Sequence, residues 1–267
     1  MGRIFSTLAH YLGVYREFLN TSFSQALSFR VHFILLIFMD LFFYASALLT
    51  VDYLYTHVEQ IGIWNREQFL FFISFMLALD HLHMTFISES FWSLSFAIRK
   101  GDLDFLLVKP INTIFHVFFR HIRPASMCNL LVTWSLVIYY GRVCELTMVS
   151  WILLPFLLLL GLTLLVSLEI LISTSMFWLV ESFGINFLRM QFQHLARWPD
   201  FVYQTFSRRI LTFVIPILLV GNAPVRFLFN AEDYWLLVWL AIMLLIIWVI
   251  AARLWDMGLR AYESASS

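Results

Sequence analysis

The stretch YWLLVWLAIMLLIIWVIAA, residues 234–252, holds no charged residue over nineteen positions. A helix rises about 1.5 Å per residue, so about 20 residues cover the roughly 30 Å hydrocarbon core of a bilayer. Two other long apolar runs lie at residues 31–50 and 68–88. With 61% hydrophobic residues, 29 Phe and 10 Trp in 267 residues, the chain has more apolar surface than one soluble core could bury. The sequence therefore predicts an all-α integral membrane protein.

Three further crossings are expected between these runs. One lies at residues 124–140, where Pro124 suits a first helical turn because its missing N–H is not needed there. The apolar run from Trp151 to Val180 would be about 45 Å long as one helix, which is too long for a single crossing. We expect it to divide near residues 173–175, into spans at 150–171 and 176–196. The prediction is six transmembrane helices in a single transmembrane domain, residues 1–267.

The segment from Arg208 to Asn222 contains an apolar stretch that is too short to cross a bilayer. Pro216 interrupts this stretch and breaks any continuous helix. Irregular backbone at membrane depth is tolerated only where protein or water satisfies its polar groups. We therefore predict a re-entrant element, within an external region at residues 197–230, just before the sixth span.

The basic residues predict the orientation. An even number of crossings puts both termini on one side, and the side with more Lys and Arg is normally the cytoplasm. The termini and the segment between spans two and three carry ten basic residues: Arg3, Arg16, Arg30, Arg99, Lys100, Lys109, Arg120, Arg123, Arg253 and Arg260. The opposite side carries six: Arg66, Arg142, Arg197, Arg208, Arg209 and Arg226. Both termini are therefore expected in the cytoplasm.

The first 28 residues form a separate pattern. Apolar side chains recur at helical spacing while Arg3, His10 and Glu17 fall on another face; the apolar set is Ile4, Leu8, Tyr11, Leu12, Tyr15, Phe18 and Leu19. This pattern is typical of a helix that lies in the membrane interface.

A polar segment, IRKGDLDFLLVKP at residues 98–110, gathers five charges between two apolar spans, in an expected cytoplasmic region at residues 92–123. Two cations followed by Gly101 are a helix stop. Asp102 and Asp104 then favour the start of a short helix that ends near Lys109 and Pro110. One side of this helix carries three leucines, Leu103, Leu106 and Leu107. We interpret this face as a docking surface for a protein partner; a solvated loop is the alternative.

Three carboxylates fall inside expected spans: Asp40, Asp80 and Glu169. An unpaired charge in hydrocarbon is costly, so each should face protein or water. Two interpretations stay open, a structural bond between helices and a contact with substrate or gate. Asp80 shares a helix face with His83 but not with His81, so no metal site is expected. The formal net charge of zero also gives no reason to expect nucleic acid as a partner.

Three segments carry a family resemblance: GDLDFLLVKP at 101–110, RRILTFVIPILLVGNAPVRFL at 208–228 and WDMGLRAYESASS at 255–267. In this order they resemble the bacterial type-2 ABC transporter permeases, specifically a six-span branch of exporter subunits. The resemblance implies an interfacial N-terminal helix, six spans, a coupling helix that contacts the ATPase between spans two and three, and a re-entrant hairpin before span six. The family's G-x-L-D pattern corresponds to Gly101, Leu103 and Asp104, followed by Pro110. The re-entrant prolines correspond to Pro216 and Pro224. Lys109 stands where the family often has Arg, which keeps the charge and loses the bidentate fork.

The resemblance also sets expectations for partners. The phosphate-binding pattern GxxxxGK[ST] does not occur, so we expect a chain that is not itself an enzyme, with ATP and magnesium on a separate ATPase. The complex would hold two ATPase copies and a second permease protomer, identical or homologous, in a bacterial plasma membrane. The predicted function is export of a hydrophobic or amphipathic substrate. The alternative is a stand-alone ion-coupled transporter or channel that uses Asp40, Asp80 and Glu169.

Overall fold

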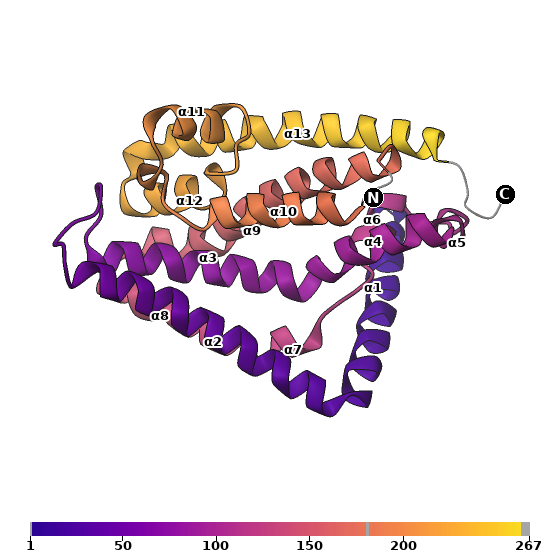
Figure 1. Cartoon of the computed structure of the whole chain (residues 1–267), viewed down its shortest axis with the longest axis horizontal. Helices are drawn as coiled ribbons and strands as arrows, with labels where there is room; N and C mark the ends of the chain where they lie inside the picture. Colours follow the sequence, from indigo (N-terminus) through magenta and orange to yellow (C-terminus); the bar gives the residue numbers. More distant parts are fainter. Residues whose placement is uncertain (1, 180–181, 263–267) are drawn as a thin grey trace. The chain divides into compact units, whose positions relative to one another are not determined.

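The structure is a computed structural model of the 267-residue chain, and it describes residues 2–179 and 182–262. Over these residues the regular structure is helical, apart from one bridge pair between Ile61 and Trp64 (Figure 1). The predicted all-α class is confirmed.

Four helices are long and apolar enough to cross a membrane within the described part of the chain. They are α2 (Arg30–Tyr55), α3 (Arg66–Phe86), α9 (Met148–Thr174) and α13 (Tyr234–Ala261). A 3-10 turn, η1 (Ser175–Phe177), extends α9, and another, η3 (Ala231–Asp233), precedes α13. These helices coincide with the runs predicted at 31–50, 68–88, 150–171 and 234–252. A multi-pass membrane protein is therefore confirmed.

The remaining two predicted spans are formed differently. Pro124 opens a helix as expected, but α7 (Pro124–Met127) stops after one turn and α8 (Leu130–Val143) follows it. The break coincides with Asn129, whose Nδ2 donates to the carbonyl oxygen of Ile37 at 3.3 Å. In place of a helix over 176–196 the structure has α10 (Ser182–Ala196). At 14 and 15 residues, α8 and α10 are about 21–22 Å long, shorter than a bilayer core.

The other helices are shorter or interfacial in pattern. They are α1 (Gly2–Ser28), α4 (Ser88–Lys100), α5 (Leu103–Leu107), α6 (Thr113–Phe118), η2 (Asp200–Val202), α11 (Thr205–Phe213) and α12 (Leu219–Phe229). The α-helical part of the long run ends at Thr174, near the predicted division, and the 3-10 turn η1 continues it to Phe177. There the hydroxyls of Thr174 and Ser175 donate to the carbonyl oxygens of Ile170 and Ile172, each at 2.7 Å.

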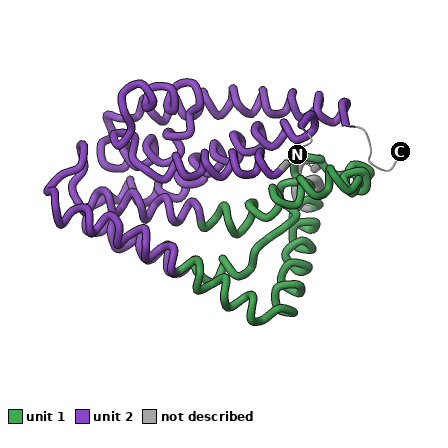
Figure 2. The backbone as a smooth tube through the Cα atoms, viewed as in Figure 1, with its two compact units in different colours: residues 1–41, 81–130, 263–267 green, residues 42–80, 131–262 purple. Residues whose placement is uncertain are grey.

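Figure 2 shows that the chain forms two compact units. Unit 1 comprises residues 1–41, 81–130 and 263–267, and unit 2 comprises residues 42–80 and 131–262. In unit 1, α4 packs against α5 and α6, with the rings of Phe91 and Phe118 in contact at 4.7 Å. In unit 2, α9 packs against α12 and α13.

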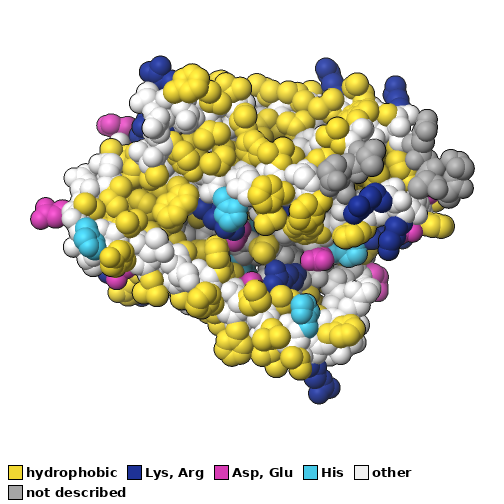
Figure 3. All heavy atoms as spheres, in the orientation of Figure 1, with side chains coloured by type: hydrophobic (Ala, Val, Ile, Leu, Met, Phe, Trp, Pro, Cys, Tyr) yellow, Lys and Arg dark blue, Asp and Glu magenta, His cyan; other side chains and the backbone are white. Residues whose placement is uncertain are grey.

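The apolar surface agrees with a membrane environment. Only 11% of the most apolar window of α2 and 22% of that of α13 are buried inside the protein, against 83% for α3. Figure 3 shows hydrophobic side chains over most of the visible face. Exposed apolar surface of this extent must be covered by lipid or by another protein.

Candidate functional site

The polar segment after α4 folds into the predicted helix stop and second helix. Gly101 has φ 77°, the left-handed conformation that glycine adopts without a steric penalty, and its N–H bonds the carbonyl oxygen of Ile98. Helix α5 begins at Leu103, directly after Asp102, and has Asp104 in its first turn. The local sequence is sufficient to place this turn between α4 and α6.

Most of the leucine side of α5 is buried inside the protein and is not free to bind a partner, as the sequence had suggested it would be. Leu103 and Leu106 are 0% and 7% exposed, because α5 packs against α4 and α6 of its own unit. The prediction of a three-leucine docking face is therefore wrong for these two residues, and only Leu107 is exposed. A five-residue helix is unstable alone, so it needs such an anchor.

The outer side of α5 presents different residues. Phe105 and Val108 are 71% and 81% exposed, which is unusual for large apolar side chains. The charged or rigid residues of the predicted site around them are also exposed, namely Asp102, Lys109 and Pro110, while Asp104 is half-buried. We call Phe105 and Val108 with these neighbours the α5 surface. Sequence periodicity alone did not single out Phe105 and Val108, because it does not show which side of a short helix is anchored.

Helix α1 packs against α6, which follows α5, through side chains from Tyr11 onward. The hydroxyl of Tyr11 accepts from the backbone N–H of Asn112 at 3.0 Å, and the side chain of Asn112 caps α6 by accepting from the N–H of Phe115. The ring of Phe18 stacks on His116 at 5.8 Å. Part of the apolar side predicted for the membrane interface therefore contacts α6. Ile4 and Leu8 lie outside the residues whose side chains are described.

Asp40, the first intramembrane carboxylate, lies in unit 1 and has two partners. Its Oδ2 accepts from the hydroxyl of Ser126 at 2.9 Å, and its Oδ1 lies 3.5 Å from Nη2 of Arg123. The Asp40 and Arg123 side chains are only 12% and 20% exposed. These bonds join α2 to the start of the third predicted crossing.

Asp80, in unit 2, is held by Arg197, whose Nη2 lies 3.2 Å from both carboxylate oxygens. The guanidinium also lies over the ring of Phe43, 4.8 Å from its centroid. Asp80 follows Arg66 by 14 residues, which is about 21 Å along α3. Arg197, which the sequence analysis counts with the external basic residues, therefore pairs with a carboxylate about 21 Å along α3 from Arg66.

The backbone between α10 and α11 is irregular. Beyond Ala196 the chain continues through η2 without an α-helix until Thr205. Along this path Trp198 contacts Phe69 at 6.4 Å between ring centroids, and Phe201 contacts Trp64 at 5.1 Å. Successive residues of this segment therefore contact positions progressively closer to the start of α3. Aromatic side chains of α3 and of the preceding loop thus pack against this irregular segment.

A cavity of about 260 Å³ adjoins the Asp80 and Arg197 pair. Apolar side chains, including Ile73, Met76 and Leu77, form much of its remaining wall. A mostly apolar cavity with one charged end suits an amphipathic molecule.

Glu169 forms a fully buried ion pair. Its Oε1 lies 3.0 Å from Nη1 of Arg189, both side chains are 1% exposed, and Gln193 also donates to it. The pair joins α9 to α10. The sequence left Arg189 unassigned inside a span, although an opposite charge on the preceding span was a signal that could have identified the partner. In the described part of the chain, no three side chains of His, Cys, Asp or Glu are placed to hold a metal ion.

The hairpin predicted around Pro216 consists of α11 and α12, with Pro216 in the turn between them. Pro224 lies inside α12, so the N–H that would bond the Val220 carbonyl in a regular helix is missing. That carbonyl faces Gly161 of α9, where any Cβ would clash with it. Residues 219–225 are all buried. Helix α12 is thus a core element of unit 2.

Comparison with known proteins identifies the family. A family described as ABC-2 family transporter protein matches residues 41–266. The chain belongs to the ABC-2 transporter family. It is a type-2 ABC transporter permease, so the resemblance seen in the three sequence segments is confirmed. No curated protein and no solved structure matches the chain.

The family match places the described features in one context. The matched region contains the α5 surface, Asp80, Glu169, the α11–α12 hairpin and α13. Asp40 lies one residue before the matched region, and α1 lies outside it. Membership in this family implies that the permease works with an ABC ATPase.

Proposed function

We propose that this permease is the membrane subunit of an ATP-driven exporter for a hydrophobic or amphipathic substrate. Family membership is the observation that carries the proposal. The chain has no GxxxxGK[ST] pattern, so ATP and magnesium would be bound and ATP hydrolysed by the partner ATPase, and the permease would not itself be an enzyme.

The α5 surface is the proposed ATPase contact. Phe105 and Val108 would enter a groove of the ATPase while Asp102 and Lys109 set the orientation through their charges. The buried Leu103 and Leu106 would transmit the movement, because they connect α5 to α4 and α6. Two ATPase copies would serve two permease protomers, identical or homologous, with the pathway between the protomers.

Six crossings remain the proposed topology, with both termini in the cytoplasm of a bacterium and the chain in its plasma membrane. The four long helices supply four crossings. Helices α7 and α8, with the break between them, would together supply the third crossing over residues 124–143. Helix α10 with the segment that follows it supplies the fifth. The hairpin would then border the translocation pathway near its outer mouth, and the cavity beside Asp80 supports an amphipathic substrate.

The alternative, ion-coupled transport through Asp40, Asp80 and Glu169, has less support. Each of the three carboxylates is instead paired with an arginine of the protein. We therefore assign these pairs a structural role in joining helices.

The experiment is capture of the ATPase by affinity-tagged permease. Phe105→Ser and Val108→Ser should abolish co-purification and transport-coupled ATP hydrolysis while leaving the permease monodisperse with an unchanged melting temperature. The matched control is Leu12→Ser on α1, which removes an apolar side chain that is 62% exposed and should change neither. Undiminished capture by the Phe105→Ser, Val108→Ser double variant would contradict the proposed contact, and a permease that never captures an ATPase would contradict the function.

A further inference from the structure

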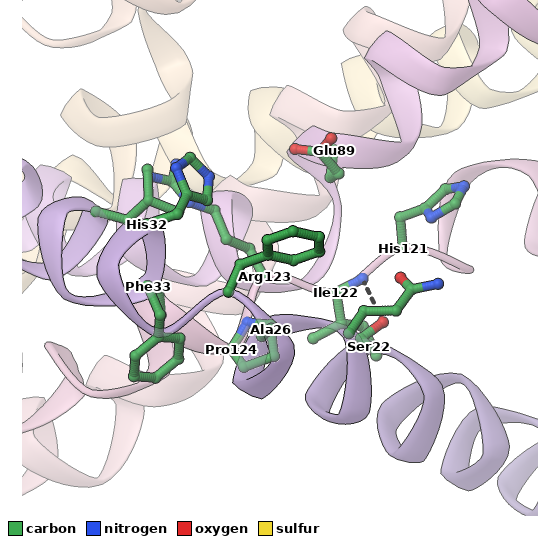
Figure 4. A pocket seen from close by; sticks show the side chains of 13 residues that line it. Ser22, Ala26, His32, Phe33, Glu89, His121, Ile122, Arg123 and Pro124 are labelled. Atoms are coloured by element: carbon green, nitrogen blue, oxygen red, sulfur yellow. Dashed lines mark hydrogen bonds between the residues drawn. The ribbon is translucent and has the colours of Figure 1, made fainter.

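A cavity of about 660 Å³ lies in unit 1, where α1 ends and α2 begins (Figure 4). Its polar lining comes from four segments: Gln25 of α1, His32 of α2, Glu89 of α4, and His121 and Arg123 of the loop before α7. The loop is held in place from below, because the backbone N–H of Ile122 donates to the hydroxyl of Ser22 at 3.3 Å.

Glu89 supplies the cavity with an anionic group. Glu89 is exposed and forms no ion pair with any described residue. Arg123 is compensated by Asp40, but that contact uses one guanidinium nitrogen at 3.5 Å. A guanidinium has five N–H donors, so most of the donors of Arg123 remain for a ligand. The cavity thus offers a carboxylate and, separately, a cationic donor.

His121 supplies a second donor. Its Nε2 accepts from Nε of Arg120 at 2.9 Å. Burial, with smaller contributions from Arg120 and His116, lowers the pKa of His121 to about 4, so the ring is neutral near pH 7. A neutral imidazole that accepts through Nε2 carries its proton on Nδ1. The Nδ1–H can therefore donate to an acceptor in the cavity.

The surroundings indicate that this acceptor belongs to a lipid. Phe29, Phe33 and Leu36 form the apolar part of the lining. They adjoin the outer side of α2, where Val31, Ile34, Leu35, Phe38 and Met39 are each more than half exposed. In a bilayer, acyl chains cover such a surface. Arg30 begins α2, so the cavity lies at the end of the apolar run, where phospholipid headgroups are found.

We propose that this cavity binds the phosphoethanolamine headgroup of a membrane phospholipid. The phosphate accepts from Arg123 and from Nδ1–H of His121, and the ammonium donates to Glu89. The glycerol backbone and the first methylenes lie on Phe29, Phe33 and Leu36. The cavity volume of about 660 Å³ accommodates a headgroup with its glycerol.

The charges select among headgroups. Phosphatidylglycerol has the phosphate but brings no cation to Glu89. Phosphatidylcholine has a cation, but its quaternary nitrogen has no hydrogen to donate to a carboxylate. Of the three headgroups compared, only ethanolamine satisfies both sides of the cavity. The inference concerns a lipid bound to the permease and stands apart from the proposed export function, because binding is measured without an ATPase.

The test is native mass spectrometry of the detergent-purified permease with the three phospholipids, all with the same acyl chains. Wild type should retain phosphatidylethanolamine over the other two. Glu89→Gln should lower that retention about two- to fivefold, as loss of an exposed ion pair does, and should remove the preference over phosphatidylglycerol. The control is Glu232→Gln, which neutralises another exposed carboxylate and should change nothing.

The phosphate side is tested at His121, since Arg123 also holds Asp40. His121→Leu should weaken all three lipids alike, because all three carry the phosphate. Equal or stronger retention of phosphatidylglycerol by wild type, a comparison that needs no variant, would overturn the proposal. So would an unchanged preference in Glu89→Gln. Displacement of the lipid by soluble phosphoethanolamine would instead indicate a site for the free headgroup and would also overturn it.

Discussion

Gly161 provides the sharpest test of how the hairpin is packed. A Cβ at this position would come closer than 3.0 Å to the carbonyl oxygen of Val220 and within 3.3 Å of Cδ1 of Leu79. The first of these atoms belongs to the backbone of α12 and cannot rotate away. Gly161→Ala therefore requires α9 and α12 to move apart.

The expected loss follows from two opposing effects. Overpacking a closely packed contact costs about 1–3 kcal/mol. Alanine recovers about 0.8–1 kcal/mol of helix propensity relative to glycine. The net change is a destabilisation of up to about 2 kcal/mol, which lowers the melting temperature of a chain of this size by up to about 8 °C. Gly13→Ala is the matched control, because no atom lies within 4 Å of the added methyl in α1 and only the propensity gain remains.

The assay is thermal unfolding of purified variants in one detergent, followed by size-exclusion chromatography. Pro224→Ala in the same background adds a mechanistic test, since it restores the N–H that can draw the Val220 carbonyl back into α12. The cost of Gly161→Ala should then decrease, giving a measurable coupling between the two positions. If Gly161→Ala melts at or above the wild-type temperature, as Gly13→Ala should, the reasoning about this helix contact is refuted.

Three further outcomes are expected. Arg189→Leu leaves the buried Glu169 without its arginine, at a cost of about 3–5 kcal/mol, so the folded yield should collapse, while the Leu/Leu double variant should recover much of it; a normal yield of the single variant would contradict this. Burial lowers the pKa of His121 to about 4, below its value near 6.5 in the unfolded chain. Between pH 6.5 and 4 the unfolded chain therefore binds this proton and the folded chain does not, so the free energy of unfolding should decrease as the pH falls through this range. Thermal unfolding at several pH values should show a smaller decrease for His121→Gln. In a background without the native cysteines, cysteines at Asn65 and Ser267 should react with impermeant reagent from opposite faces, with Ser267 protected in intact cells, and labelling of both from outside would refute the proposed topology.

Features set by neighbouring residues could be predicted from the sequence. The absence of charge over residues 234–252 is sufficient to predict a spanning helix, because helix length and bilayer thickness are both fixed. Gly101 could be recognised as a helix stop because the left-handed conformation is a property of one residue. Pro216 could be placed in a break for the same kind of reason. The family resemblance rested on these local patterns and on their order.

Partners distant along the chain were decided only by the tertiary structure. Asp80 and Arg197 are separated by 117 positions, and no local pattern connects them, so Arg197 was assigned to an external loop. The same limit applied to α5: the spacing of Leu103 and Leu106 predicted one apolar side, but whether a partner or the chain's own α4 and α6 covers that side depends on packing. Hydropathy indicates how much apolar surface must be removed from water. It does not indicate whether lipid, a partner or the chain itself covers that surface. The sequence by itself therefore determined the helical membrane character and the breaks between helices, and the tertiary structure decided the ion pairs and the exposed face of the coupling helix.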